Sequence, residues 1–355
     1  MKHTSWTSGT RSTLSRRHAL RLGAAGLAAT GAALSGWPSI ATAQSTRKLT
    51  STLSWIPNSQ FSGLWMALEK GYFADKGIEV DWRPGGPNTP NPVERVASGE
   101  VQYGQQANPR PVLEAIARGN DFVVFGSTFQ RQPGGLLSLA ANPIKSPEDI
   151  VGKKIICPNP TDVRTIEVTL QINNLPNDFT YVPGGFDPQP LIEGQADAML
   201  AFATSQPVVL ENKGMERERD FFHRTWDDLG QPGYNNFLFA KREWLEENRQ
   251  LVVDYLSAEL RGWKDVEADP EAAARLTVEE YGIDFGLDEQ RELRSLQLII
   301  PFLHSDDTAQ NGLFWIDANR LGGPIYDALR LGGLEGLPDV DKFLDMSILM
   351  DAHAA

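Results

Sequence analysis

The fold of this chain is decided by one stretch, Leu53-Ser54-Trp55-Ile56-Pro57-Asn58-Ser59-Gln60-Phe61-Ser62-Gly63-Leu64-Trp65-Met66-Ala67-Leu68-Glu69-Lys70-Gly71-Tyr72-Phe73. It begins with the alternating apolar residues of a short strand, which Pro57 and Asn58 end. Ser62 and Gly63 can begin a helix, and Gly71 stops it. A strand that ends beneath a helix N-terminus places backbone N–H groups at a sheet edge, where open α/β sheets bind small molecules.

Two interpretations of the aromatic residues in this stretch stay open. In the first, Trp55, Asn58 and nearby aromatic residues form one wall of a ligand cleft. In the second, the stretch is an ordinary βα unit whose tryptophans lie in the core. The local pattern alone favours the second interpretation, because most aromatic side chains serve packing.

The composition is that of a soluble globular protein of 355 residues, with 41% hydrophobic and 22% charged residues, long enough to divide into two lobes. A net charge of −13 argues against nucleic acid or an anionic membrane surface as a partner. One cysteine, Cys157, excludes an intrachain disulfide and lacks the partners of a zinc or redox motif. It ends an apolar run, which predicts a buried strand residue. We therefore expect no metal and no cofactor.

Residues 1–43 have the pattern of a targeting segment that is absent from the mature protein. They hold five basic residues and no acidic one, followed by a weakly apolar run and the cleavage signal Ala41-Thr42-Ala43. Arg16-Arg17 resembles the twin-arginine export signal, and a plain secretory signal or a retained transmembrane helix is the alternative. Cleavage after Ala43 would place the mature chain in the periplasm and take its net charge from −13 to −18.

Beyond residue 44, apolar runs of strand length alternate with helical patterns. This alternation predicts an α/β fold, in which a parallel sheet carries helices on both faces. The predicted strands are 49–55, 78–82, 101–103, 122–125, 136–140, 153–157, 179–182, 196–201 and 236–240.

Several short motifs occur in a fixed order along residues 48–245. They are Trp55-Ile56-Pro57-Asn58, Glu69-Lys70-Gly71-Tyr72-Phe73, Gly77-Ile78-Glu79-Val80, Phe129-Gln130-Arg131, Lys145-Ser146-Pro147-Glu148-Asp149-Ile150-Val151-Gly152-Lys153-Lys154 and Glu193-Gly194-Gln195-Ala196-Asp197-Ala198. Behind an export signal, this ordered set resembles the periplasmic substrate-binding proteins of ABC importers. The most similar group is the NMT1/THI5-like family, which is related to the SsuA and ThiY proteins.

The resemblance implies a type II periplasmic-binding-protein fold with two lobes, each a mostly parallel sheet flanked by helices. Lobe 1 would comprise residues 44–127 and 227–355, and lobe 2 residues 128–226, with hinge crossings near 127–131 and 222–226. Ligand would bind between the lobes, and closure would present the complex to a membrane permease and, through it, to an ATPase. The resemblance further implies a monomer that is not an enzyme.

The ligand is expected to be a flat aromatic or heterocyclic molecule of the thiamine-pyrimidine precursor type. Pyrimidine-binding members carry an acidic residue before the Trp-x-Pro-Asn motif and a histidine after it, where this chain has Ser54 and Phe61. The exchange removes polar contacts to an aminopyrimidine and adds an apolar surface. An organosulfonate or an aromatic carboxylate is therefore the alternative ligand, and a pyrimidine-synthesis enzyme is the alternative of a different class. Against the enzyme, the chain has no cysteine-rich iron-binding cluster like that enzyme's.

The candidate ligand-binding residues fall into three chemical groups. Stacking faces are expected from Trp55, Phe61, Phe129, Phe202 and Tyr234, and hydrogen bonds from Asn58, Gln105, Gln106, Asn108, Gln130, Thr204 and Asn235. Arg131 and Arg164 could meet a carboxylate, sulfonate or phosphate. The alternatives are a structural ion pair for Arg131 and a solvated surface position for Arg164.

Overall fold

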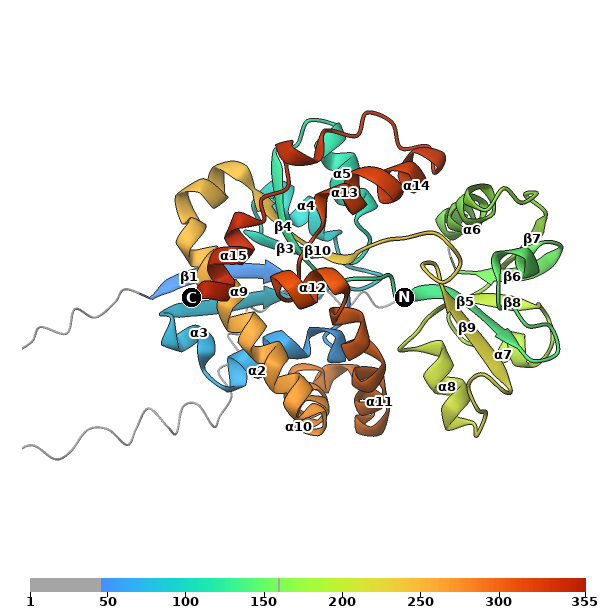
Figure 1. Cartoon of the computed structure of the whole chain (residues 1–355). Coiled ribbons are helices and arrows are strands. Elements are labelled where there is room, and N and C mark those ends of the chain that lie inside the picture. Colours follow the sequence, from blue (N-terminus) through green and yellow to red (C-terminus); the bar gives the residue numbers. More distant parts are fainter. Residues whose placement is uncertain (1–45, 159) are drawn as a thin grey trace, which may run out of the picture. The chain divides into compact units, whose positions relative to one another are not determined.

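The computed structural model describes residues 46–158 and 160–355, so the predicted export segment lies outside the described residues. Figure 1 shows two sheets, each flanked by helices. Each sheet has five strands, and in each a single strand runs antiparallel to its neighbours while the other pairings are parallel. The predicted α/β architecture of two mostly parallel sheets is confirmed.

The first sheet has the strand order β2-β1-β3-β10-β4. Its strands are β1 (Arg47–Thr52), β2 (Ile78–Arg83), β3 (Tyr103–Gln106), β4 (Phe122–Phe129) and β10 (Asn235–Lys241). β10 is the antiparallel member and lies between β3 and β4. A strand from late in the chain is thereby inserted into a sheet whose other strands come from residues 47–129.

The second sheet has the strand order β7-β6-β8-β5-β9. Its strands are β5 (Gly134–Leu139), β6 (Lys153–Cys157), β7 (Phe179–Pro183), β8 (Ala198–Phe202) and β9 (Phe221–Thr225). β5 is antiparallel to both of its neighbours. Cys157 is buried at the end of β6, as its apolar run predicts.

Two segments connect the sheets, at residues 130–133 between β4 and β5 and at residues 226–234 between β9 and β10. The first overlaps the predicted crossing at 127–131. The predicted second crossing, at 222–226, begins too early, because Phe222 to Thr225 pair with β5 inside the second sheet.

Most helices accompany the first sheet. These are α2 (Ser62–Glu69), α3 (Tyr72–Asp75), α4 (Pro92–Ser98), α5 (Arg110–Ala117), α9 (Arg242–Ala268), α10 (Pro270–Leu276), α11 (Glu289–Ile299), α12 (Asp306–Asn311), α13 (Ala318–Arg320), α14 (Tyr326–Leu331) and α15 (Ser347–Ala354). Those of the second sheet are α6 (Pro160–Ile172), α7 (Gln189–Ile192) and α8 (Gln206–Asn212). The first sheet therefore lies in the larger core.

The packing of α2 against α9 explains the glycine at the start of the α2 helix. A Cβ on Gly262 of α9 would lie 2.0 Å from the carbonyl oxygen of Gly63, and a Cβ on Gly63 would lie 2.2 Å from the indole of Trp263. The two helices therefore cross where neither has a side chain, which is the close backbone approach that glycine permits. This contact holds the opening stretch of the chain against the longest helix.

Candidate functional site

The carboxyl ends of β1, β3 and β4 meet the beginning of β10 at one edge of the first sheet. The register pairs Gln105 with Leu238 and Gln106 with Phe237, so both glutamines lie inside β3. The sequence had predicted that the strand ends at residue 103 and that both glutamines follow it. Asn235 pairs with Phe129, the last residue of β4 before the first connecting segment. This edge therefore lies beside both segments that lead to the second sheet.

Asn236 is the centre of a buried polar network at this edge. Its side-chain Nδ2 donates to Gln105 Oε1 at 3.3 Å and to Thr128 Oγ1 at 2.9 Å. Its Oδ1 accepts a hydrogen bond from Ser54 Oγ at 3.0 Å, and Ser54 Oγ accepts one from Gln60 Nε2 at 3.3 Å. The backbone of Asn236 is left-handed, with φ of 68°, a conformation that asparagine adopts more readily than most residues. The sequence pattern predicted Asn235 as a site residue, but not Asn236.

Glu259 of α9 closes the network from beneath the sheet. Its carboxylate accepts from Gln105 Nε2 at 3.3 Å and from the Tyr103 hydroxyl at 3.4 Å, and the residue is only 2% exposed. Burial raises the pKa of Glu259 to about 7, although the hydrogen bonds from Gln105 and Tyr103 lower it. Glu259 was not among the predicted site residues, yet it lies four residues from both Tyr255 and Trp263, which are buried. Residues four apart lie on the same face of a helix, so this spacing could have indicated from the sequence that Glu259 is buried.

Two side-chain oxygens at this edge are buried without a hydrogen-bond partner. They are Oε1 of Gln106 and Oδ1 of Asn235, and both were among the predicted ligand contacts. A buried acceptor left without a donor costs about 1–3 kcal/mol. A ligand that donates an N–H or O–H group here would recover that cost.

The predicted stacking residues divide by exposure. Trp55 is 36% exposed and Phe202 is half-buried, so both offer surface. Phe61, Phe129 and Tyr234 are buried. These three pack inside the larger part of the protein instead of lining its surface.

Each buried aromatic has a specific partner in that core. Phe61 meets Trp65 at 6.3 Å between ring centroids, and Phe129 meets Trp263 edge-on at 6.4 Å. The hydroxyl of Tyr234 accepts a hydrogen bond from the backbone N–H of Asp317 at 2.9 Å. Such T-shaped and hydrogen-bonded arrangements are those of core aromatics.

Four predicted polar contacts have structural hydrogen bonds. The side chain of Asn58 accepts from the Gln60 backbone at 3.1 Å and begins a 3₁₀ turn, η1 (Ser59–Phe61), and Asn108 accepts from the Arg110 backbone at 2.9 Å where α5 begins. Asn58 is the N-cap residue of its turn, as is common for asparagine, whereas the N-cap position of α5 is held by Pro109. The others are Gln130, whose Nε2 donates to the Ser127 carbonyl at 3.3 Å, and Thr204, whose carbonyl accepts from Ser295 Oγ at 2.8 Å.

The two predicted arginines have acidic partners. Arg131 lies 3.9 Å from Asp228 with its guanidinium over the ring of Phe302, and Arg164 pairs with Glu167 at 2.8 Å. Arg164 also donates a hydrogen bond to the carbonyl of Leu331, and this bond joins α6 to α14.

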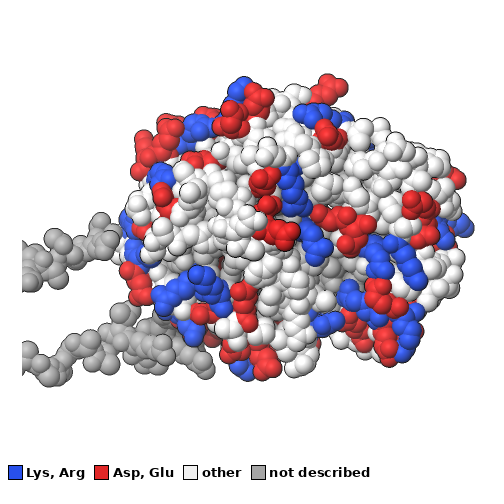
Figure 2. Space-filling model, in the orientation of Figure 1, with Lys and Arg blue, Asp and Glu red and all other residues white. Residues whose placement is uncertain are grey.

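A third arginine, which sequence reasoning missed, lies beside the connecting segments. Arg320 pairs with Asp227 at 3.1 Å and donates to the Gln130 carbonyl at 2.7 Å. Burial raises the pKa of Asp227 to about 6, against the lowering effect of backbone hydrogen bonds and of the nearby arginines. On the face drawn in Figure 2, basic and acidic side chains are interspersed in the same way.

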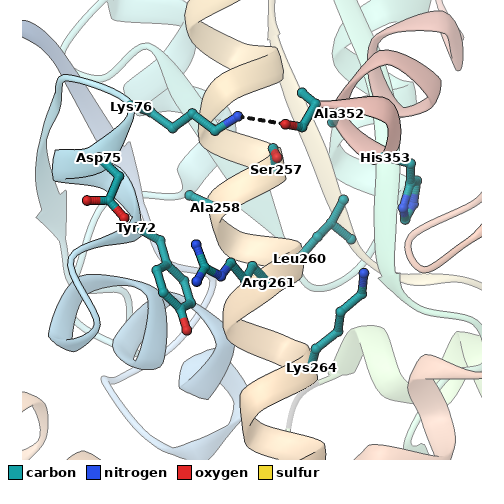
Figure 3. A pocket seen from close by; sticks show the side chains of 11 residues that line it. Tyr72, Asp75, Lys76, Ser257, Ala258, Leu260, Arg261, Lys264, Ala352 and His353 are labelled. Atoms are coloured by element: carbon teal, nitrogen blue, oxygen red, sulfur yellow. Dashed lines mark hydrogen bonds between the residues drawn. The ribbon is translucent and has the colours of Figure 1, made fainter.

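A pocket of about 250 Å³ lies elsewhere, between α3, α9 and α15 (Figure 3). Arg261 lies over the ring of Tyr72, 3.7 Å from its centroid, and Lys76 donates to the carbonyl of Ala355 at 3.2 Å. The pocket is lined by helices and chain ends, and it lies away from the strand edges where the buried polar network is formed. We therefore place the candidate site at the edge of the first sheet.

The described residues, 46–158 and 160–355, contain no cluster of metal ligands and no candidate membrane span. That part of the chain holds no group of three histidine, cysteine or acidic residues arranged to bind a metal ion. It also holds no helix that combines the length and the apolar character of a membrane span.

Comparison with known proteins gives relatives of two kinds. The chain is 26% identical to the formylaminopyrimidine-binding protein of Halalkalibacterium halodurans, over 75% of this chain and 84% of that protein. It is 25% identical to the riboflavin-binding protein RibY of Chloroflexus aurantiacus, over 82% and 83% of the two chains. It is also 29% identical to 4-amino-5-hydroxymethyl-2-methylpyrimidine phosphate synthase THI13 of Saccharomyces cerevisiae, over 64% and 69%.

Among solved structures, the fold is similar to that of the periplasmic aliphatic sulphonate binding protein SsuA of Escherichia coli. The TM-score is 0.58 at 16% identity, covering 83% of this chain and 91% of that one. This likeness confirms the predicted periplasmic-binding-protein fold. The model of the family described as NMT1/THI5 like matches residues 58–273, which is more than half of the chain. The chain therefore belongs to the NMT1/THI5-like family.

Proposed function

We propose that this protein is the extracytoplasmic solute-binding component of an ABC importer and captures a small, uncharged aromatic or heterocyclic molecule. The family and the fold support the binding-protein class. The two relatives that match along more than four fifths of their own length are named for binding a formylaminopyrimidine and riboflavin. Both of those ligands are flat heterocycles with N–H groups.

The proposed ligand lies between two lobes built on the two sheets. Lobe 1 would comprise residues 44–127 and 227–355, and lobe 2 residues 128–226. The strand pairing supports this division, with connecting segments at 130–133 and 226–234. The lobes also meet away from these segments, since Arg294 of α11 donates to Glu211 of α8 at 2.7 and 3.1 Å. Closure of such a clamp is the signal that a permease would recognise.

The unpartnered oxygens of Gln106 and Asn235 are the observation that carries the ligand class. Both oxygens are hydrogen-bond acceptors without a donor. An aminopyrimidine or a flavin has N–H groups that could donate to them, and a sulfonate group has none. Trp55, with more than a third of its surface exposed, would offer the stacking face for such a ring.

An organosulfonate or aromatic carboxylate is the second candidate ligand. It would need a free cation, and Arg131 and Arg164 are the arginines that sequence reasoning named for this role. Both already have carboxylate partners, and so has Arg320 beside the connecting segments. An anionic ligand would have to compete with these carboxylates for the arginines, which opposes its binding.

A pyrimidine-synthesis enzyme is the candidate of a different class, favoured by the synthase relative. Against this activity, the thiol of Cys157 is buried and its pKa is raised to about 12, first by burial and then by Asp162. A thiol of this kind is a poor nucleophile and a poor metal ligand at neutral pH. Stoichiometric binding without turnover of the bound heterocycle would favour the binding protein.

The setting that we propose follows the sequence pattern. The chain would be exported, by the twin-arginine or the general secretory route, and cleaved after Ala43. It would act in the periplasm as a monomer that delivers ligand to a permease and its ATPase.

The proposal is tested by a thermal-shift screen of the protein without residues 1–43. The ligands would be formylaminopyrimidine, hydroxymethylpyrimidine, riboflavin, aryl and alkyl sulfonates and aromatic carboxylates. A ligand at one hundred times its Kd stabilises the folded state by about 2.7 kcal/mol, which raises the melting temperature measurably. We expect the heterocycles to bind and the Trp55→Ala variant to lose both affinity and the ligand-induced change in fluorescence. Stabilisation by sulfonates or carboxylates alone would refute the proposed ligand class.

A further inference from the structure

Glu259 is a carboxylate with no cation beside it. Among the described residues, its hydrogen-bond partners are Gln105 and Tyr103, and no lysine, arginine or histidine pairs with it. A carboxylate accepts hydrogen bonds and donates none, so its charged form requires both partners to act as donors. Glu259 therefore determines which end of the Gln105 amide points toward α9.

The orientation of Gln105 determines the orientation of the next side chains in turn. With Nε2 directed to Glu259, Oε1 of Gln105 accepts from Nδ2 of Asn236. Oδ1 of Asn236 is then left to accept from Ser54 Oγ, which in turn accepts from Gln60 Nε2. If the Gln105 amide were reversed, two acceptors would meet at Glu259 and two donors would meet at Asn236. The hydrogen bonds thus run in one direction from the core to the sheet edge.

We propose that Glu259 is a positioning residue for ligand binding, which sets the donor and acceptor pattern of the amides at the sheet edge without touching the ligand. This inference rests on the proposed function, because the edge that it organises is the proposed ligand site. The neighbours of the oriented amides in the chain are Gln106 and Asn235, which carry the unpartnered oxygens.

Protonation of Glu259 would release this constraint. A protonated carboxyl donates one hydrogen bond, so either orientation of the Gln105 amide then finds a compatible partner. The titratable groups that face Glu259 are Tyr103 from β3 and Tyr255 from its own helix. Burial and the charge of Glu259 raise the pKa of both hydroxyls well above their ordinary value, so they keep their protons.

Three other ionisable groups of α9 are bound to partners outside this network. They pair as Arg47 with Asp254, Arg249 with Asp351 and Tyr72 with Asp265. The carboxyl of Glu259 is therefore the group at this position whose charge changes near neutral pH, and ordered amides and tight binding are expected above its pKa.

The test begins with side-chain amide resonances, which need no ligand. In the full-length protein labelled with ¹⁵N-glutamine and ¹⁵N-asparagine, the resonances of Gln105 and Asn236 should shift with pH, with a midpoint near the pKa of about 7. They should lose this titration in Glu259→Gln, which resembles the protonated acid at every pH. The control is Asp254→Asn, which removes a carboxylate from the same helix but pairs with Arg47 outside the network, and it should keep the titration.

Binding of formylaminopyrimidine and riboflavin at pH 6 and pH 8 completes the test. The wild type and Glu259→Asp, which keeps the carboxylate, should bind several-fold more tightly at pH 8, and Glu259→Gln should bind equally at both. Amide resonances that do not titrate in the wild type, or that titrate equally in Glu259→Gln, would overturn the inference. So would wild-type affinity that is independent of pH. If neither probe binds the wild type, the proposed ligand class fails, and the amide titration alone decides the role of Glu259.

Discussion

Replacing Glu259 by glutamine should change how the stability of this protein depends on pH. Burial raises the pKa of Glu259 in the folded protein from the ordinary value of 4.5 to about 7. Below the lower value the carboxyl is protonated in both states and contributes no difference. As the pH rises between the two values, the unfolded chain releases the proton and the folded protein keeps it, which lowers the free energy of unfolding.

The size of this effect follows from the shift. One pKa unit corresponds to about 1.36 kcal/mol, so the full shift amounts to about 3 kcal/mol, and most of it falls between pH 5 and pH 8. Glutamine does not titrate. The free energy of unfolding of Glu259→Gln, minus that of the wild type, should therefore rise by about 2–3 kcal/mol over this range.

Urea denaturation at half-unit steps from pH 5 to pH 8 measures this difference. All other groups titrate in both proteins, so their contributions cancel when one curve is subtracted from the other. Asp254→Asn on the same helix is the matched control, and its curve should run parallel to that of the wild type. Parallel curves for Glu259→Gln as well would show that the buried carboxyl titrates normally, and the electrostatic reasoning would be refuted.

Three further predictions address the packing, the network and the thiol. Gly262→Ala should destabilise the protein by about 1–3 kcal/mol in chemical denaturation, because its Cβ would lie 2.0 Å from the Gly63 carbonyl oxygen, and unchanged stability would contradict the crossing of α2 and α9. Asn236→Ala should cost about 3 kcal/mol through lost hydrogen bonds and left-handed backbone strain, and Asn236→Gly should recover about 1 kcal/mol of it, whereas equal losses would exclude strain. Cys157 should resist thiol reagents at pH 8 in the native protein and react at once in denaturant, since burial keeps its pKa at about 12, and rapid native labelling would show the β6 end to be open.

The succession of strands and helices along the chain could be predicted from the sequence because its signals are local. The strand at Lys153–Cys157 was predicted with the bounds that the structure has, since an apolar run there lies between breaker residues. Gly71 stops α2 through a left-handed backbone, as its position after an apolar periodic segment indicates. Motif order likewise sufficed to predict the family, which a match over residues 58–273 confirms.

The composition of the candidate site was predicted only in part. Gln105, Gln106 and Asn235 do lie together at one sheet edge. Their placement beside one another depends on β10, which returns from more than a hundred residues later to enter the sheet between β3 and β4. Nothing in the local pattern of either segment specifies that partner.

The sequence by itself determined the alternation of strands and helices, the buried cysteine and the family. Tertiary structure alone decided which polar and aromatic side chains face the core. Phe129 is buried by Trp263, and Glu259 is carried beneath Gln105, 154 positions away in the chain. The physical reason is that burial and pKa depend on neighbours brought together by folding, whereas hydrophobic periodicity records only which residues a single element turns inward.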